Sequence, residues 1–150
     1  MQKLAFLAST SIVISTGAQL TNILGPTTVA SAETGIYGPQ LGTYASPFDG
    51  DLSTGYASYA GQQAGATFQI DLEAPTELKA IYIGMKDNVY QYKFDIFFGD
   101  IDQSGNYASN KKCGDDVQVG LVKCEGTGRY LVWELENSGA VIAFDEIMAF

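Results

Sequence analysis

Period-two alternation of apolar and polar residues constrains the fold of this chain more than any other sequence feature. Residues 67–72 and 90–99 both alternate, which places their apolar side chains on one face. After residue 32 the sequence has no helical stripe of any length, and Gly-rich turns separate its short apolar runs. This pattern predicts an all-β fold, an antiparallel β-sandwich. Trp133 lies within an alternating apolar segment, so we expect it in the core.

Several strand boundaries follow from the same pattern. Residues 74–76, with Pro75 at their centre, predict a break between one strand at 67–72 and another at 78–83. Residues 117–123 and 129–135 predict a strand pair joined by a Gly-containing turn.

The first 32 residues have the layout of a secretory signal peptide. A short basic start at Lys3 precedes a mostly apolar, uncharged run, and Ala30-Ser31-Ala32 offers a small-x-small cleavage site before Glu33. The sequence therefore predicts a leader at 1–32, a β-sandwich domain at 33–150, and a secreted or extracytoplasmic location. A retained membrane anchor is the alternative, although polar residues interrupt the apolar run.

The net charge and the cysteine content restrict the classes of binding partner and indicate the redox compartment of the protein. The whole chain has 17 acidic residues, 8 basic residues and no histidine. A strongly acidic surface repels nucleic acid and anionic lipid headgroups, so neither is an expected partner. Cys113 and Cys124 are the only cysteines, and an even count in an exported chain predicts a disulfide between them, with two free thiols as the alternative.

The segment from Ser46 to Tyr56 concentrates oxygen-bearing side chains in a turn. Asp49-Gly50-Asp51 suits a tight turn that aims side-chain and backbone oxygens at one point. Hard cations such as Ca²⁺ prefer an all-oxygen cage of this kind. A solvated Asp-Gly turn between strands is the alternative reading.

Four pieces of the sequence, in order, resemble discoidin-type domains, which include the coagulation-factor C-terminal domains, F-type lectins and many carbohydrate-binding modules. The opening piece is Asp49-Gly50-Asp51 with Thr54 and Tyr56, where the family usually has Trp in place of this Tyr. The other pieces are the strands 68–72, 128–133 and 144–147. The second half also resembles an F-type lectin, in Phe94 to Gly99, the two cysteines and the Gly-Arg-Tyr strand that starts at Gly128.

The resemblance implies an eight-stranded jelly roll of the galactose-binding-like type and a structural Ca²⁺. Carried over residue by residue, it implies about six oxygen ligands, within the usual range for this ion. The residues that would supply them are Ser46, Asp49, Asp51, Thr54, Asp145 and Glu146.

A neutral glycan or glycoconjugate is the partner that the resemblance and the loop composition predict. Sugar sites combine aromatic faces with amides and charges that bond hydroxyls. The predicted ligand residues are Tyr56, Tyr59, Gln62, Lys86, Asp87 and Asn88. F-type lectins bind fucose through a His and two Arg, whereas this chain has no His and Arg129 as its only arginine, so fucose recognition by that mechanism is not expected.

The sequence predicts a binding module and no enzyme. Without His no Ser–His or Cys–His pair can form, and no nucleophile elbow or phosphate-binding glycine loop is present. The alternative is an adhesion domain that binds a protein or cell-surface partner without catalysis. Membrane lipid ranks below both, because the loops lack an exposed apolar spike.

Overall fold

A computed structural model of the chain describes residues 11–13, 19–33, 42–51, 53–57, 64–84, 93–136 and 142–150. Almost all regular structure in these residues is antiparallel β-sheet, as the alternation predicts. The strands are β1 (Ser11–Val13), β2 (Gln19–Thr21), β3 (Val29–Glu33), β4 (Tyr56–Ala57), β5 (Thr67–Gly84), β6 (Phe94–Gly99), β7 (Lys111–Val117), β8 (Gly120–Leu135), β9 (Ala143–Phe144) and β10 (Glu146–Ala149). Two short 3-10 turns, η1 (Ser46–Phe48) and η2 (Tyr107–Ser109), complete the described elements. Among these residues no helix is long and apolar enough to cross a membrane.

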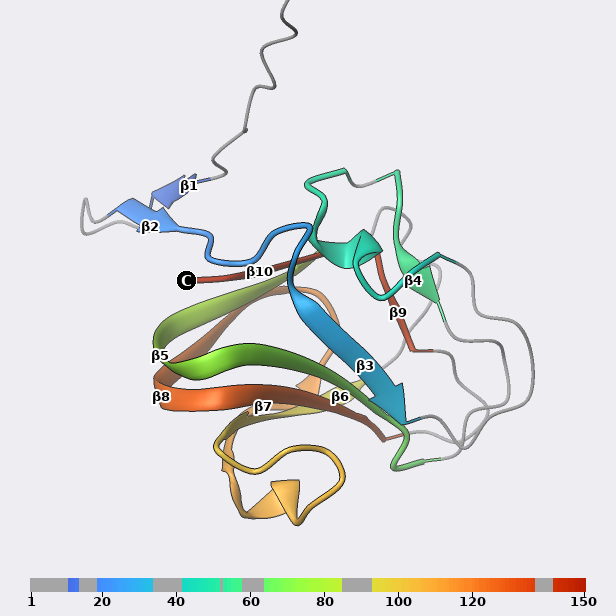
Figure 1. The fold of residues 1–150 in the computed structure, drawn as a ribbon, viewed down its shortest axis with the longest axis vertical. Helices are drawn as coiled ribbons and strands as arrows, with labels where there is room; N and C mark the ends of the chain where they lie inside the picture. Colours follow the sequence, from blue (N-terminus) through green and yellow to red (C-terminus); the bar gives the residue numbers. More distant parts are fainter. Residues whose placement is uncertain are drawn as a thin grey trace, which may run out of the picture.

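One large sheet organises the molecule. Its strands run in the order β10-β5-β8-β6-β7, and β3 also pairs with β5, on the half of that strand that β10 leaves open. Figure 1 shows that the small β4–β9 pair and η1 form a separate group next to the β10 edge of this sheet. The fold is a β-sandwich, as predicted.

The core lies between the large sheet and the β4–β9 layer. Phe68, Trp133 and Ile96 are register partners across β5, β8 and β6, and all three are fully buried. Phe144 of β9 packs on this row, with its ring centroid 5.1 Å from that of Phe68 and 5.8 Å from that of Trp133. The prediction that Trp133 is a core residue is confirmed.

The outer face of the sheet is covered by the connection between β6 and β7. Gln103 accepts a hydrogen bond from the Thr67 hydroxyl (3.0 Å), donates its backbone N–H to Gln69 (2.7 Å) and donates its side-chain amide to Ser31 (2.9 Å). Phe97 packs edge-on against Tyr107 of η2, with ring centroids 5.6 Å apart. This cover explains why residues on both faces of β6 are buried.

Two predicted strand boundaries are wrong. The break at 74–76 is an irregularity in the register with β8 within the single strand β5, which resumes pairing at Thr76. The predicted pair 117–123 and 129–135 is also one continuous strand, β8 from residue 120 onwards, and its partners are β5 and β6. Glycines within long bent strands produce the same local signal as a turn, and only the pairing partner distinguishes the two.

The sandwich begins N-terminal to the predicted boundary at residue 33. Val29–Glu33 pair with Thr67–Asp71, and Leu24 is 8% exposed within the core. Ala149 donates its backbone N–H to Asn22 Oδ1 (3.0 Å), which ties this segment to the last strand. The apolar, small-residue composition that suggested a leader also suits an edge strand packed on a core. Removal of a leader at or near Glu33 stays a prediction, and it would delete most of β3.

The disulfide is confirmed. Cys113 of β7 and Cys124 of β8 are bonded, with Cα atoms 5.0 Å apart, and Cys124 is fully buried.

Candidate functional site

The opening loop is fixed by its own oxygens. Pro47 and Phe48 of η1 are buried and anchor its start, and Gly50 has a positive φ of 78°, which glycine adopts without strain. Asp49 Oδ1 accepts the backbone N–H of Asp51 (2.9 Å), and its Oδ2 accepts the Thr54 hydroxyl (2.6 Å). Thr54 also donates its backbone N–H to the Asp51 carbonyl (3.0 Å). The loop therefore turns the Asp49 carboxylate toward the Thr54 hydroxyl, whereas the Asp51 carboxylate accepts the backbone N–H (2.8 Å) and the hydroxyl (2.6 Å) of Ser53.

The last strand brings a buried carboxylate to this loop. Glu146, the first residue of β10, is 2% exposed. Its Oε2 accepts the backbone N–H of Gly50 (3.1 Å), although the two residues are 96 positions apart in sequence. Burial, with smaller contributions from the carboxylates of Asp49 and Asp51, raises the pKa of Glu146 to about 7. An acid held among other acids, away from water, is a group that a cation would stabilise.

The two remaining predicted metal residues border the same place. Asp145 donates its backbone N–H to the Gly84 carbonyl (3.1 Å). Its side chain lies against Gly55: a Cβ atom added to Gly55 would be 2.8 Å from Asp145 Oδ1. The Ser46 hydroxyl accepts the backbone N–H of Thr43 (3.0 Å). That bond occupies the Ser46 side chain in the turn, so its carbonyl is the oxygen suited to an ion. The donor set, carboxylate and backbone or hydroxyl oxygen, fits Ca²⁺.

Tyr56 is not placed as a ligand residue. It lies in β4, is 2% exposed, and packs between the rings of Tyr44 (5.2 Å) and Phe68 (5.4 Å). Burial raises the pKa of its hydroxyl to about 12. The prediction that Tyr56 contacts a ligand is therefore corrected: its ring is part of the core, where the resemblance expects a Trp.

The other predicted ligand residues, Tyr59, Gln62, Lys86, Asp87 and Asn88, lie outside the residues that the structure describes. Their flanking residues are described. Ala57, where β4 ends, pairs with Ala143 in β9, and Gly84, where β5 ends, pairs with Glu146 in β10. The two connections that carry predicted ligand residues thus follow strands β4 and β5, which pair with β9 and β10. Glu146, which carries the buried carboxylate, is the first residue of β10.

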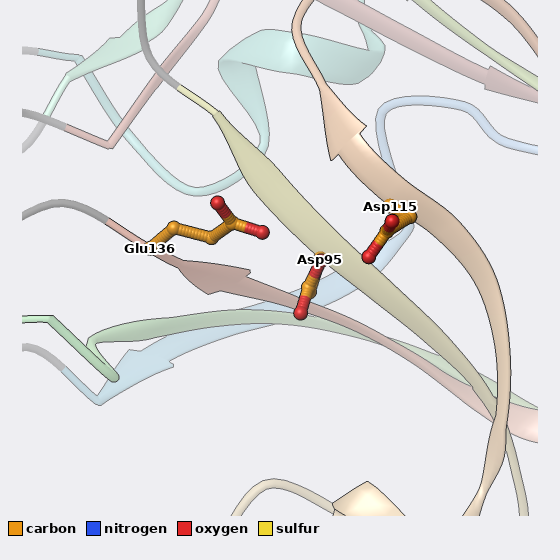
Figure 2. A group of neighbouring side chains, drawn as sticks. All are labelled: Asp95, Asp115 and Glu136. Carbon is orange, nitrogen blue, oxygen red and sulfur yellow. The ribbon is translucent and has the colours of Figure 1, made fainter.

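A second acidic group was missed by the sequence reasoning. Figure 2 shows Asp95, Asp115 and Glu136, whose nearest carboxylate oxygens all lie within 4.8 Å of one another. Lys112 bonds both Asp95 and Asp115 at 2.5 Å and supplies a positive charge there. Contacts with Asp116 and then Asp95 raise the pKa of Glu136 to about 7. The residues come from β6, from β7 and from the position directly after β8, so no sequence spacing could have indicated the group.

Comparison with solved structures identifies the fold. A fucolectin from striped bass (Morone saxatilis) serum superposes with a TM-score of 0.66 and 17% identity, over 81% of this chain and 46% of that one. A fucose-binding module of Streptococcus pneumoniae gives 0.61 and 16%, over 87% of this chain and 98% of that one. A family 32 carbohydrate-binding module of Clostridium perfringens, solved with GlcNAc-α-1,4-galactose, gives 0.64 and 19%, over 85% and 92%.

The chain has the discoidin-like, galactose-binding-like sandwich fold. The fold resemblance inferred from four short sequence pieces is thereby confirmed. No protein-family model and no curated protein sequence matches the chain.

Proposed function

We propose that this protein is an exported, lectin-like module that binds a neutral glycan and has no catalytic role. The observation that carries the proposal is the fold, which this chain shares over more than four fifths of its length with proteins described as a fucolectin, a fucose-binding module and a carbohydrate-binding module. The net charge of −9 further favours a neutral partner over an anionic one.

We further propose that Ca²⁺ joins the opening loop to the last strand. The carboxylates of Asp49 and Glu146, the hydroxyl of Thr54 and nearby carbonyls would hold the ion, whose positive charge would offset that of the carboxylates. The support is the buried Glu146 carboxylate, which meets a backbone N–H and two acidic neighbours. Because both predicted ligand connections start beside this clamp, calcium would fix their starting points for sugar binding.

Fucose recognition through arginines receives no support. Arg129, the only arginine, lies on β8 and donates two hydrogen bonds to Asp71, from Nε (2.7 Å) and from Nη2 (2.8 Å). It is committed to that carboxylate and to the face of Tyr130, 5.0 Å from its ring centroid. Hydroxyl recognition would therefore fall to Tyr59, Gln62, Lys86, Asp87 and Asn88.

A glycan array with the full chain tests the proposal. We expect binding to a restricted set of neutral glycans, lost in the double variant Tyr59→Ala and Lys86→Ala with little change in melting temperature. Lys111→Ala, which removes an exposed lysine on β7, is the matched control and should bind like the wild type. An array without hits, combined with capture of a defined protein partner, would support the adhesion function in place of glycan binding.

A further inference from the structure

A cavity of about 370 Å³ lies on one edge of the large sheet, away from the loop that we propose to hold calcium. It is lined by residues 23–25 and 27–29, before and at the start of β3, and by residues 71–73 and Thr76 at the bend of β5. The cavity arises because β3 pairs with β5 only up to Asp71, whereas the pairing of β10 with β5 begins at Ile81. The segment before β3 crosses the space between them, held by the Ile23 N–H on the Ala149 carbonyl (2.9 Å).

The wall formed by β5 is locally strained and rigidly held. Glu73 has φ 66°, one of two positive φ values at non-glycine residues in the described part of the chain, and such a conformation costs free energy for a residue with a Cβ. Asp71 Oδ1 accepts the Glu73 N–H (2.7 Å), and Asp71 is itself fixed by Arg129. Pro75 restricts the residue before it. Strain that the surroundings maintain in this way is common at ligand sites.

The lining has the mixed character of a sugar pocket. Ile23 and Val29 are 49% and 48% exposed and offer an apolar surface. Beside them, Thr27 offers a hydroxyl, and the Thr28 hydroxyl accepts the Gly25 N–H (2.9 Å) and can donate. Thr76 lies across the cavity, and its hydroxyl donates to the Ala74 carbonyl (3.0 Å) and can accept. A pyranose presents the same combination, with apolar C–H faces and hydroxyls at the rim that both donate and accept.

The charged residues on the β5 side of the cavity favour some pyranoses over others according to the charge of the sugar. Arg129 neutralises Asp71 and holds the pKa of that carboxyl below its usual range, so the exposed Glu73 carboxylate leaves the cavity net negative. A carboxylate accepts hydrogen bonds from sugar hydroxyls, attracts an ammonium group and repels another carboxylate. The volume is at the lower end of the roughly 300–1,000 Å³ of small-molecule pockets, which suits a single ring.

We propose that this cavity is a second carbohydrate site that takes one pyranose ring, prefers an amino sugar and rejects a uronic acid. It is separate from the proposed loop site, because Glu146 pairs with Gly84 at one end of β10 and Ile23 contacts Ala149 at the other. These two ends are roughly 10 Å apart at the rise of a strand. The second site does not depend on calcium.

The test uses three probes with the same ring and different charge: glucosamine, glucose and glucuronate. Each sugar is titrated into the ¹⁵N-labelled full chain in the presence of EDTA, and binding is monitored in ¹⁵N–¹H NMR spectra. The amide resonances of Thr27, Thr28 and Thr76 should shift. We expect glucosamine to bind several-fold more tightly than glucose, and glucuronate to cause no shifts. Shifts that map elsewhere, equal binding of all three probes, or no shifts at 50 mM glucosamine would each overturn the proposal.

Substitution of Glu73 supplies matched controls. Glu73→Gly removes the carboxylate and suits the positive φ, so the protein should fold and lose glucosamine binding at least tenfold. Glu73→Gln should retain glucose binding and lose the preference for glucosamine. Glu125→Gln, which changes an exposed acid on β8 that does not line the cavity, should bind all three probes like the wild type. A Glu73→Gly protein that binds glucosamine normally would refute the assignment, and an unchanged glycan-array profile for this variant would show that the loop site is independent of it.

Discussion

Removal of residues 1–32 should strongly destabilise the protein, whereas removal of residues 1–18 should not. The two truncated chains differ in residues 19–32, which contain β2, the buried Leu24 and most of β3. The same comparison decides where a leader can be cleaved, because an exported chain must keep the residues that complete its sheet.

The size of the effect follows from the contacts of this segment. Burial of Leu24 contributes about 1.5–3 kcal/mol. The hydrogen bonds of Asn22 with Ala149 and of Ser31 with Gln103 contribute about 1 kcal/mol each. With the packing of Ala30 and the loss of strand pairing, the free energy of unfolding should fall by about 5 kcal/mol, out of a total that is typically about 5–15. For a domain of this size the melting temperature should then fall by roughly 10–20 °C.

Circular dichroism melts of chains starting at Gln19 and at Glu33 measure this difference. Leu24→Ala should lower the free energy of unfolding by about 2–5 kcal/mol. Its neighbour Ile23→Ala, half-exposed, should change it by less than about 0.5 kcal/mol. N-terminal sequencing of exported protein shows whether the leader ends near Glu33, as the sequence predicts, or before Asn22, as the contacts of this segment favour. Equal melting temperatures of the two truncated chains would refute the reasoning and favour cleavage at Glu33.

Three further predictions concern the metal, an acid and the disulfide. Millimolar Ca²⁺ should raise the melting temperature by several degrees over EDTA, and the two melts should coincide in Glu146→Gln; coincident wild-type melts would argue against calcium. The Glu136 carboxyl should titrate near pH 7 by ¹³C NMR, and Asp116→Asn should move the midpoint toward the usual 4.5. Because the pKa is higher in the folded state, protonated Glu136 stabilises the fold at low pH, and this stability is lost as the pH rises from 4.5 to about 7. Replacing Cys113 and Cys124 by Ser should cost about 2–3 kcal/mol of unfolding free energy in urea, and an unchanged midpoint would contradict this.

The disulfide and the core row were accessible from sequence because each depends on local rules. Two cysteines in one chain leave a single possible intramolecular pair, and alternation in a strand places Phe68 and Trp133 on buried faces whatever their neighbours are. By contrast, the sequence predicts a break where β5 bends, because Pro75 carries the same local signal in both cases. Pairing with β8, which resumes at Thr76 with Gly128, decides that the strand continues.

Some features of the candidate site were also predictable from the sequence, whereas others depend on tertiary contacts. The oxygen-rich turn at Asp49 and its family resemblance are properties of one short segment, so the sequence indicated them. That Glu146 would be 2% exposed and bonded to Gly50 depends on how β10 docks against the first loop. Tyr56 had the right composition for a ligand platform and lies in the core instead, because β4 pairs with β9 and turns its ring toward Phe68.

The sequence by itself determined the all-β class, the disulfide and the oxygen-rich turn at Asp49, because period-two patterning, cysteine count and turn chemistry follow from the sequence without knowledge of which strands become neighbours. Only the tertiary structure decided that residues 22–32 pack on the sandwich, that Asp95, Asp115 and Glu136 come together from separate segments, and that a cavity opens where β3 and β10 leave β5 uncovered. These features depend on contacts between segments far apart in the chain. The free energy of such contacts is set by which strands become neighbours, and no local pattern specifies that choice.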